Sequence, residues 1–151
     1  MNNDIYLKIM QAKGKLKTCF DITVAGSSML PVLKESDIIT VTGQDDYNTG
    51  DVLVFIYKQG ELLVHRLLKI QNGKYYFKGD NSFRLEDVTK EQIIGKVITA
   101  NGVPLQERNS EHIAMSYTVN REFRKCGYDA EKTKQSDIYT FYASKYLIGV
   151  K

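Results

Sequence analysis

Tryptophan is absent from the sequence, and only two prolines, two cysteines and two histidines occur among its 151 residues. Two cysteines cannot supply a disulfide framework. A structural zinc site would need both cysteines and both histidines at once, and their spacing does not suggest one. We therefore expect no metal and no other cofactor.

Long apolar segments are missing as well. The uninterrupted apolar runs are short, for example Val52–Tyr57, whereas a membrane-spanning helix needs about twenty such residues. The segment from Met1 to Phe20 contains no apolar stretch of signal-peptide length. These absences predict a soluble protein that is cytoplasmic or peripheral to a membrane, with neither a signal peptide nor a transmembrane span in this chain.

Charge of one sign is also scarce. Lys and Arg total 21 and Asp and Glu total 18, so the net charge is +3. Nucleic-acid-binding domains usually have clustered basic residues and a pI above about 9, so we expect no nucleic acid partner. The hydrophobic fraction of 42% and the charged fraction of 26% are typical of a globular protein. The length suits one domain with an appendage.

Charge and hydrophobic pattern divide the chain into three parts. In the first, Ile5, Ile9 and Met10 could share one face of a helix surrounded by lysines. That helix could dock on an anionic surface or a partner, or lie solvated on the core. The expected parts are a basic N-terminal arm (residues 1–19), a β-rich core (residues 20–104) and a helical C-terminal extension (residues 105–151).

The middle part contains short apolar or alternating segments separated by turn residues. Asn72-Gly73 in particular is typical of a two-residue hairpin turn. Such a series predicts a mainly β fold, either an antiparallel sheet assembly or an open barrel. The expected strands are Phe20–Ala25, Asp37–Val41, Val52–Tyr57, Leu62–Ile70, Lys74–Lys78 and Ile93–Thr99.

The last part changes to helical spacing. Asn109 or Ser110 could cap a helix that ends before Gly127. Ser136-Asp137 could start a second helix, although the aromatic residues that follow also suit a strand.

The segment Gly26-Ser27-Ser28-Met29 follows a predicted strand. A glycine lets the backbone turn sharply, which leaves a serine hydroxyl exposed at the strand end and backbone N–H groups free to face an oxyanion. Pro31 then prevents continued strand pairing. The segment is a candidate nucleophile turn, with an ordinary strand-to-loop turn as the alternative.

A serine nucleophile needs a base, and the candidates are His65, His112 or a desolvated lysine. His65 lies in an apolar strand, on the face shared with Leu63 and Leu67, so it is either that base or a satisfied core residue. His112 lies among polar residues at a helix start, and we expect it to be solvated.

A neutral imidazole that acts as a base also needs an acid to orient it. Asp80 lies in a Gly-Asp-Asn turn at a strand end, and Glu86 and Asp87 follow soon after. Any of the three could face His65. The alternatives are turn capping by Asp80 and a solvated pair of acids at Glu86 and Asp87.

Six short segments occur in a recognisable order: GSSMLPVL, SDIITV, GDVLVF, LLVHRLLKI, YYFKGDNS and IIGKV. Together they resemble the type I signal peptidase family and its relatives in the superfamily of signal peptidases and LexA-like serine peptidases. The resemblance covers about residues 22–98. It implies an antiparallel β catalytic fold of the signal peptidase/LexA-like kind and hydrolysis of peptide bonds.

The resemblance also implies roles for single residues. Ser28 matches the nucleophile and His65 matches the base. The usual bacterial enzymes hold Lys at that place, whereas the Val-His-Arg sequence here is similar to endoplasmic-reticulum, archaeal and spore-former variants. The third member in those variants is an Asp in or after Gly-Asp-Asn, so both Asp80 and Asp87 match. The spacing of the following segment differs, and Glu86 is not excluded.

The resemblance extends to the oxyanion hole and the substrate. Many signal peptidases have a Ser where this chain has Gly26, so we expect the hole to use the backbone N–H of Ser28, with Ser27 as a helper and Met29 completing the turn. An extended peptide is expected to bind by strand addition. The strand residues expected to bind it are Ile22, Val24 and Ala25.

These features predict a serine endopeptidase that cleaves a leader or signal-type peptide. Its partners would be a peptide or protein substrate and a membrane-anchored or peptide-precursor protein, because no transmembrane anchor precedes the core. One alternative is a LexA-like regulator that cleaves itself. That class uses Lys as the base, and Ala25-Gly26, the upstream bond of suitable type, is too close to Ser28. The other alternative is a non-catalytic peptide-binding module on the same fold.

Overall fold

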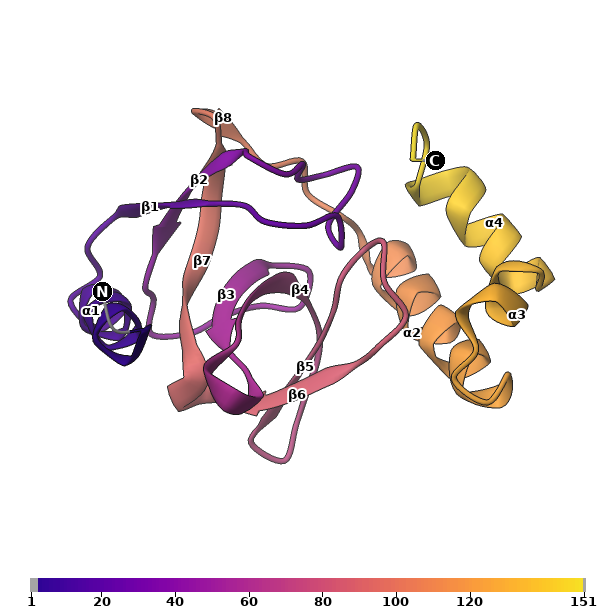
Figure 1. Cartoon of the computed structure of the whole chain (residues 1–151), viewed down its shortest axis with the longest axis horizontal. Helices are drawn as coiled ribbons and strands as arrows, with labels where there is room; N and C mark the ends of the chain where they lie inside the picture. Colours follow the sequence, from indigo (N-terminus) through magenta and orange to yellow (C-terminus); the bar gives the residue numbers. More distant parts are fainter. Residues whose placement is uncertain (1–2, 151) are drawn as a thin grey trace.

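The computed structural model describes residues 3–150 (Figure 1). Met1, Asn2 and Lys151, at the ends of the expected arm and extension, lie outside the described residues. Within this range eight strands form one sheet, in the order β1-β2-β7-β3-β4-β5-β6 with β8 paired to β7, and every pair is antiparallel. The strands are β1 (Phe20–Thr23), β2 (Ile38–Thr42), β3 (Val52–Ile56), β4 (Leu62–Gln71), β5 (Lys74–Lys78), β6 (Glu86–Thr89), β7 (Ile93–Ala100) and β8 (Val103–Pro104).

The sheet curls into a half-barrel, and the predicted mainly antiparallel β fold is confirmed. The register shifts between Thr40 and Val41, between Val54 and Phe55, and in β4 just after Leu67. Bulges of this kind bend a strand and increase its twist. Strands β1 and β6 are the two ends of the curled sheet, and the loops beside these ends form the site described below.

The hairpin patterns in the sequence correspond closely to the structure. Strand β5 has the predicted bounds, and Asn72 and Gly73 before it have positive φ values of 52° and 75°, as a tight hairpin turn requires. Strand β6 was not expected, because its four residues begin with two acids, Glu86 and Asp87. Glu86 points inward and is buried, so the alternative of a solvated pair of acids is wrong for that residue.

Strand β3 lies between two hydrophobic clusters, which is why its sequence is apolar at every position. Val52 and Val54 belong to a cluster with the β1, β2 and β7 side chains. Leu53 and Phe55 belong to a second cluster with the side chains of β4, β5 and β6. A strand buried on both faces has a continuous apolar run in place of alternation.

Helix α1 (Asn3–Lys15) packs on strand β7 rather than extending from the core. Met10 is buried as expected, but Ile5 and Ile9 are 52% and 45% exposed, so the predicted packing face is wrong for these two. Gly14 permits the close approach, because a Cβ there would lie 2.3 Å from a backbone oxygen of β7. The helix lies on the core.

The C-terminal residues form three helices beside the sheet (Figure 1): α2 (Ser110–Lys125), α3 (Ala130–Lys134) and α4 (Asp137–Tyr146). The side chains of Asn109 and Ser136 accept backbone N–H groups at the starts of α2 and α4. The expected helical character and both expected caps are therefore confirmed. Short 3₁₀ turns occupy Lys58–Gly60 and Lys90–Gln92.

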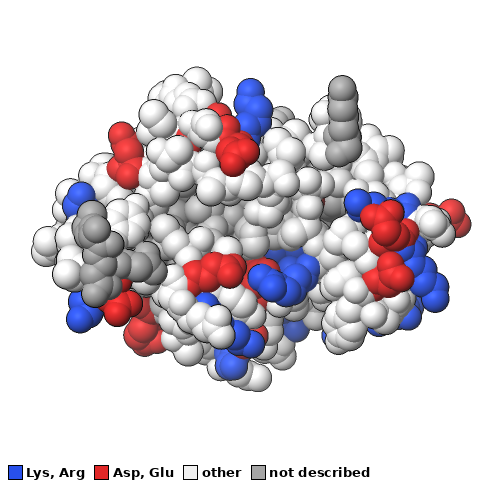
Figure 2. All heavy atoms as spheres, viewed as in Figure 1, with Lys and Arg blue, Asp and Glu red and all other residues white. Residues whose placement is uncertain are grey.

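The surface mixes both signs of charge. Figure 2 shows basic and acidic side chains interspersed over the face seen in Figure 1. No helix within residues 3–150 combines the length and apolarity needed to cross a membrane.

Candidate active site

Ser28 lies on the turn that follows β1. Gly26 begins this turn with a φ of 82°, in the left-handed region, and no atom lies within 4 Å of the position a Cβ would take. Glycine is therefore required here for its conformation and not for space. Met29 is buried and accepts the backbone N–H of Asp80 on its sulfur at 3.4 Å, which anchors the turn beside the exposed strand end.

His65 reaches Ser28 from strand β4. The ring is 5% exposed and packs edge-on against Phe55. Its Nε2 lies 2.9 Å from Ser28 Oγ, and its Nδ1 lies 2.6 Å from Glu86 Oε1. Because a carboxylate only accepts hydrogen bonds, Nδ1 carries the proton and Nε2 is left to accept the Ser28 hydroxyl. This is the arrangement that a serine nucleophile and its base require.

Of the three acids that the sequence leaves open, Glu86 contacts His65. The Glu86 side chain is 1% exposed, and its second oxygen accepts the Nε–H of Arg84 at 3.3 Å. Asp87 points to the other face of the short strand β6, where it pairs with Lys74 at 3.0 Å and its side chain is 40% exposed. Alternation along a strand explains why only one of these adjacent acids faces the ring.

Asp80 also does not contact His65, because it pairs with Arg66. The guanidinium Nε–H and Nη2–H donate to the two Asp80 oxygens at 2.9 and 2.8 Å, and Nη1–H donates to the Gly50 carbonyl at 2.7 Å. Burial opposes ionisation of Asp80, yet the hydrogen bonds and charge of Arg66 hold the pKa of that carboxyl below its ordinary value. The pair fixes the turn between β5 and β6.

Gly79 lets that turn pack directly behind the Ser28–His65 pair. A Cβ at Gly79 would lie 2.6 Å from the Ser28 backbone oxygen and 3.1 Å from His65 Cδ2. Two residues later, the Asn81 backbone N–H donates to the same Ser28 oxygen at 2.8 Å. The Gly-Asp-Asn sequence is therefore a bridge between the Ser28 turn and His65 as well as a local turn.

The turn leaves donors free for an oxyanion. Within residues 3–150, the backbone N–H groups of Ser28 and Met29 donate to no protein acceptor. The side chain of Ser27 is exposed, while its carbonyl accepts the Asn81 amide at 3.1 Å. The free N–H groups have the chemistry of an oxyanion hole.

A groove of about 270 Å³ leads to Ser28 and His65. The residues expected to bind substrate, Ile22, Val24 and Ala25, line it on one side. The first residues of β4, Leu62–Val64, line it as well. Strand β1 pairs with β2 and with no other strand of the described chain, so its second edge is open to an extended peptide.

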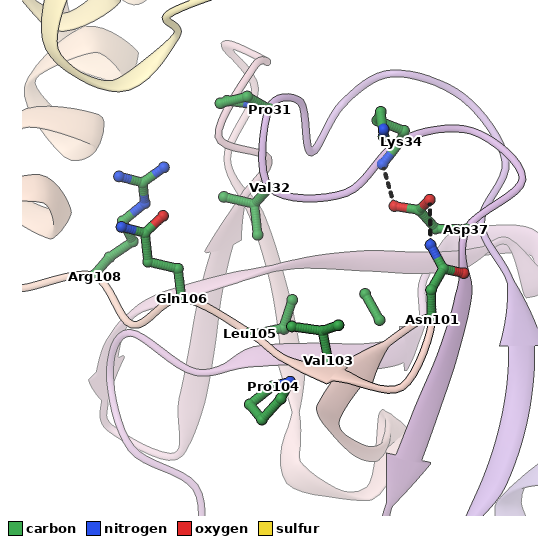
Figure 3. Close-up of a pocket in the computed structure, with 11 residues that line it drawn as sticks. Pro31, Val32, Lys34, Asp37, Asn101, Val103, Pro104, Leu105, Gln106 and Arg108 are labelled. Carbon is green, nitrogen blue, oxygen red and sulfur yellow. Dashed lines mark hydrogen bonds between the residues drawn. The ribbon is translucent and has the colours of Figure 1, made fainter.

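Another cavity, of about 340 Å³, is lined by Pro31 and Val32 on one side and by the segment from Ala100 to Arg108 on the other (Figure 3). Asp37 closes one end, where it accepts hydrogen bonds from the backbone of Lys34 and the side chain of Asn101 at 2.8 and 2.9 Å. Its lining includes neither Ser28 nor His65, so the larger volume does not make it the better candidate. No group of three His, Cys, Asp or Glu side chains in the described chain is arranged to hold a metal ion.

A second polar cluster lies where the sheet meets the C-terminal helices, and the sequence pattern did not reveal it. His112 is fully buried, so the expectation that it is solvated is wrong. Burial lowers the pKa of His112 to about 4, which leaves a neutral ring that donates from Nε2 to the Tyr142 hydroxyl at 3.2 Å. Burial also lowers the pKa of Lys78 to about 8, against the opposing charges of Asp80 and Glu86.

Comparison with known protein families agrees with the resemblance at a coarse level. A model of the family described as Peptidase S24-like matches residues 2–98, which is more than half of the chain and ends before α2. A comparison with curated proteins finds no significant match. The family supports a serine peptidase in general terms, and the finer assignment to the Ser–His type I signal peptidases stays a prediction. By this match, the chain belongs to the Peptidase S24-like family.

Proposed function

We propose that this protein is a serine endopeptidase in which Ser28 is the nucleophile, His65 is the general base and Glu86 orients the imidazole. The observation that carries the proposal is the continuous contact from Ser28 Oγ to His65 Nε2 at 2.9 Å and from His65 Nδ1 to Glu86 Oε1 at 2.6 Å. A carboxylate in that position holds the tautomer with its lone pair toward the serine and stabilises the imidazolium that forms.

The reaction follows from this geometry. His65 Nε2 takes the hydroxyl proton as Ser28 Oγ bonds to the carbonyl carbon of the substrate, and the negative charge on the carbonyl oxygen is met by the N–H groups of Ser28 and Met29. When the tetrahedral intermediate collapses, the C–N bond breaks and His65 gives its proton to the leaving amine. A water molecule then attacks the acyl-enzyme, with His65 again taking and returning the proton.

The proposed substrate is a peptide in extended form, of the leader or signal type. Its backbone would pair with the free edge of β1, and its side chains would enter the apolar groove beside Val24 and Leu62. A membrane-anchored or peptide-precursor protein would present it.

The test is the Ser28→Ala variant. Loss of the nucleophile is expected to lower kcat about 10⁴–10⁶-fold on a cleaved peptide and to abolish labelling by a fluorophosphonate probe. The variant should unfold at nearly the same urea concentration as the wild type, since Ser28 is on a turn. Ser144→Ala, which removes an exposed serine hydroxyl on α4, is the matched control. Retained peptidase activity in Ser28→Ala would refute the mechanism.

Self-cleavage is a second candidate because the matched family includes LexA-like activity. The purified chain would be incubated and its mass followed with time. An intramolecular cut would shorten the wild type at a rate independent of protein concentration, and Ser28→Ala would keep its full length. A constant mass, together with cleavage of an added peptide, would favour the endopeptidase.

A further inference from the structure

The turn at Gly79–Phe83 is the structural link between Ser28 and His65, which come from distant parts of the sheet. Asn81 donates its backbone N–H to the Ser28 carbonyl at 2.8 Å and its side-chain amide to the Ser27 carbonyl at 3.1 Å. Gly79 lies against His65 on the other side. A displacement of this turn would therefore change the distance between nucleophile and base.

The backbone of this turn is held from outside by the C-terminal helices. Tyr142 of α4 is 1% exposed, and its hydroxyl donates to the Asp80 carbonyl at 2.7 Å. Asn120 of α2 donates its side-chain amide to the Phe83 carbonyl at 2.8 Å. These two bonds hold both halves of the turn, and both donors lie outside residues 2–98, the part that matches the family.

A third connection lies at the end of β5. The Lys78 ammonium, fully buried, donates to the Gly79 carbonyl at 3.0 Å and to the Ser116 hydroxyl of α2 at 2.8 Å, and it lies 5.0 Å from the centre of the Tyr142 ring. The same cluster places His112 on the Tyr142 hydroxyl, which directs that hydroxyl's own proton to Asp80. Lys78, Asn120 and Tyr142 therefore each donate to a carbonyl of the turn.

We propose that helices α2 and α4 are a positioning element of the active site, and that Tyr142 and Asn120 are positioning residues that hold the Gly79–Phe83 turn against Ser28 and His65. The expected loss of catalytic rate rests on the proposed peptidase function. The expected loosening of the turn when these bonds are removed is independent of that function.

The size of the effect follows from how steeply reaction depends on geometry. A misplacement of about 1 Å at a nucleophile can cost about 100-fold in rate. Removing the Tyr142 hydroxyl leaves the Asp80 carbonyl buried without its donor, so the turn moves to find another partner. Neither Tyr142 nor Asn120 lines the groove beside β1, so substrate binding is expected to change little.

The experiment compares Tyr142→Phe and Asn120→Leu with the wild type and with Tyr128→Phe. Tyr128 lies in the loop between α2 and α3 and is 68% exposed, so Tyr128→Phe removes a hydroxyl without touching the turn. The first readout is the rate at which a fluorophosphonate labels Ser28, together with kcat and KM on a cleaved peptide. The second readout is hydrogen exchange of the Asn81 amide, measured by NMR against the amide of Phe55 in the central strand.

In Tyr142→Phe and Asn120→Leu we expect labelling and kcat to fall about 10- to 100-fold with KM within about threefold of the wild type. Exchange at Asn81 should accelerate at least tenfold while exchange at Phe55 stays unchanged, which separates loosening of the turn from global destabilisation. Tyr128→Phe should match the wild type in both readouts.

The outcomes separate this inference from the proposed function. Unchanged labelling and unchanged Asn81 exchange in both variants would overturn the positioning role. Equal acceleration at Asn81 and Phe55 would also overturn it, because the helices would then stabilise the whole chain without preference for the turn. If the wild type never labels, serine peptidase chemistry is refuted, while selective acceleration at Asn81 still supports the positioning of the turn.

Discussion

The two histidines of the chain lie in regions built for different purposes. His65 contacts the half-buried hydroxyl of Ser28 on one side and a buried carboxylate on the other, next to a groove that a peptide could enter. His112, on α2, is fully buried against α4 and the sheet, where it contacts the Tyr142 hydroxyl and has one ring nitrogen without a partner. Both rings have low exposure, and of the two only His65 contacts the candidate nucleophile Ser28.

This difference shows that burial alone does not make a base. The low pKa of His112 comes from burial, and it keeps the ring neutral at all but acidic pH. A neutral ring is what a base needs, but His112 has no substrate-facing hydroxyl to act on. The ring adds a hydrogen bond and volume to the junction with the C-terminal helices. What distinguishes His65 is its geometry, with the Ser28 hydroxyl on one side of the ring and the Glu86 carboxylate on the other.

The largest effect is expected when each of the two histidines is replaced in turn. His65→Gln removes the group that accepts the Ser28 proton, so kcat/KM should fall about 10⁴-fold or more. His112→Gln keeps a donor toward Tyr142 and touches no reacting atom, so it should stay within about tenfold of the wild type. Both would be measured with the peptide cleaved by the wild type. A loss of less than about tenfold in His65→Gln would mean that His65 is not the base.

The next effect concerns the acid. In Glu86→Gln the amide no longer fixes the His65 tautomer that has its proton on Nδ1, as the carboxylate does. We therefore expect kcat to fall about 10⁴-fold. Asp87→Asn, a change at the adjacent residue on the other face of β6, should cost less than about threefold because its partner is a solvated lysine. Steady-state kinetics on both variants decides between them. A larger loss in Asp87→Asn would reject Glu86 as the orienting acid.

A third prediction concerns Asp80, which pairs with Arg66 and, unlike Glu86, does not contact His65. Asp80→Asn leaves the buried Arg66 with a neutral partner, and the free energy of unfolding in urea should fall by about 3 kcal/mol. In the double variant Arg66→Met with Asp80→Asn, the loss should be smaller than the sum of the two single losses, because no unpaired charge remains. Additive losses would mean that the ion pair does not hold the turn.

The sequence predicted the parts of the site that depend on local chemistry. Gly26 and Asn72-Gly73 predict turns, and the alternation around His65 predicts that it shares a face with Leu63 and Leu67. The order of six short segments is the basis of the family resemblance. Each of these signals depends on residues that are close together in the sequence, so it can be recognised without a structure. From them we predicted the β fold, the approximate bounds of most strands and the pairing of a candidate serine with a candidate histidine.

The rest depends on contacts between distant residues. Glu86 and Asp87 are adjacent acids, and only the register of β6 against β5 decides which one faces inward. Asp80 pairs with Arg66 because β4 and β5 are neighbouring strands, and no pattern within either segment predicts this ion pair. The polar residues of the junction, His112 among them, look solvated in the sequence because the groups that bury them come from α4.

The smallest effect in this series is a pH dependence of stability that belongs to His112. Its pKa in the folded protein is about 4, below the ordinary value of 6.5, so between these values the unfolded chain binds a proton that the folded chain refuses. The free energy of unfolding should therefore fall as the pH drops from 6.5 to 4, by about 3 kcal/mol at most. Asp80 contributes a further loss only at lower pH, because its pKa is held below the ordinary value.

Urea unfolding of the wild type and of His112→Gln, measured at intervals between pH 7 and pH 4, isolates this contribution. The variant should have the shallower slope, and the two slopes should differ most between pH 6.5 and pH 4. Identical slopes for the wild type and His112→Gln would show that the buried ring takes up its proton as readily in the folded protein as in the unfolded chain.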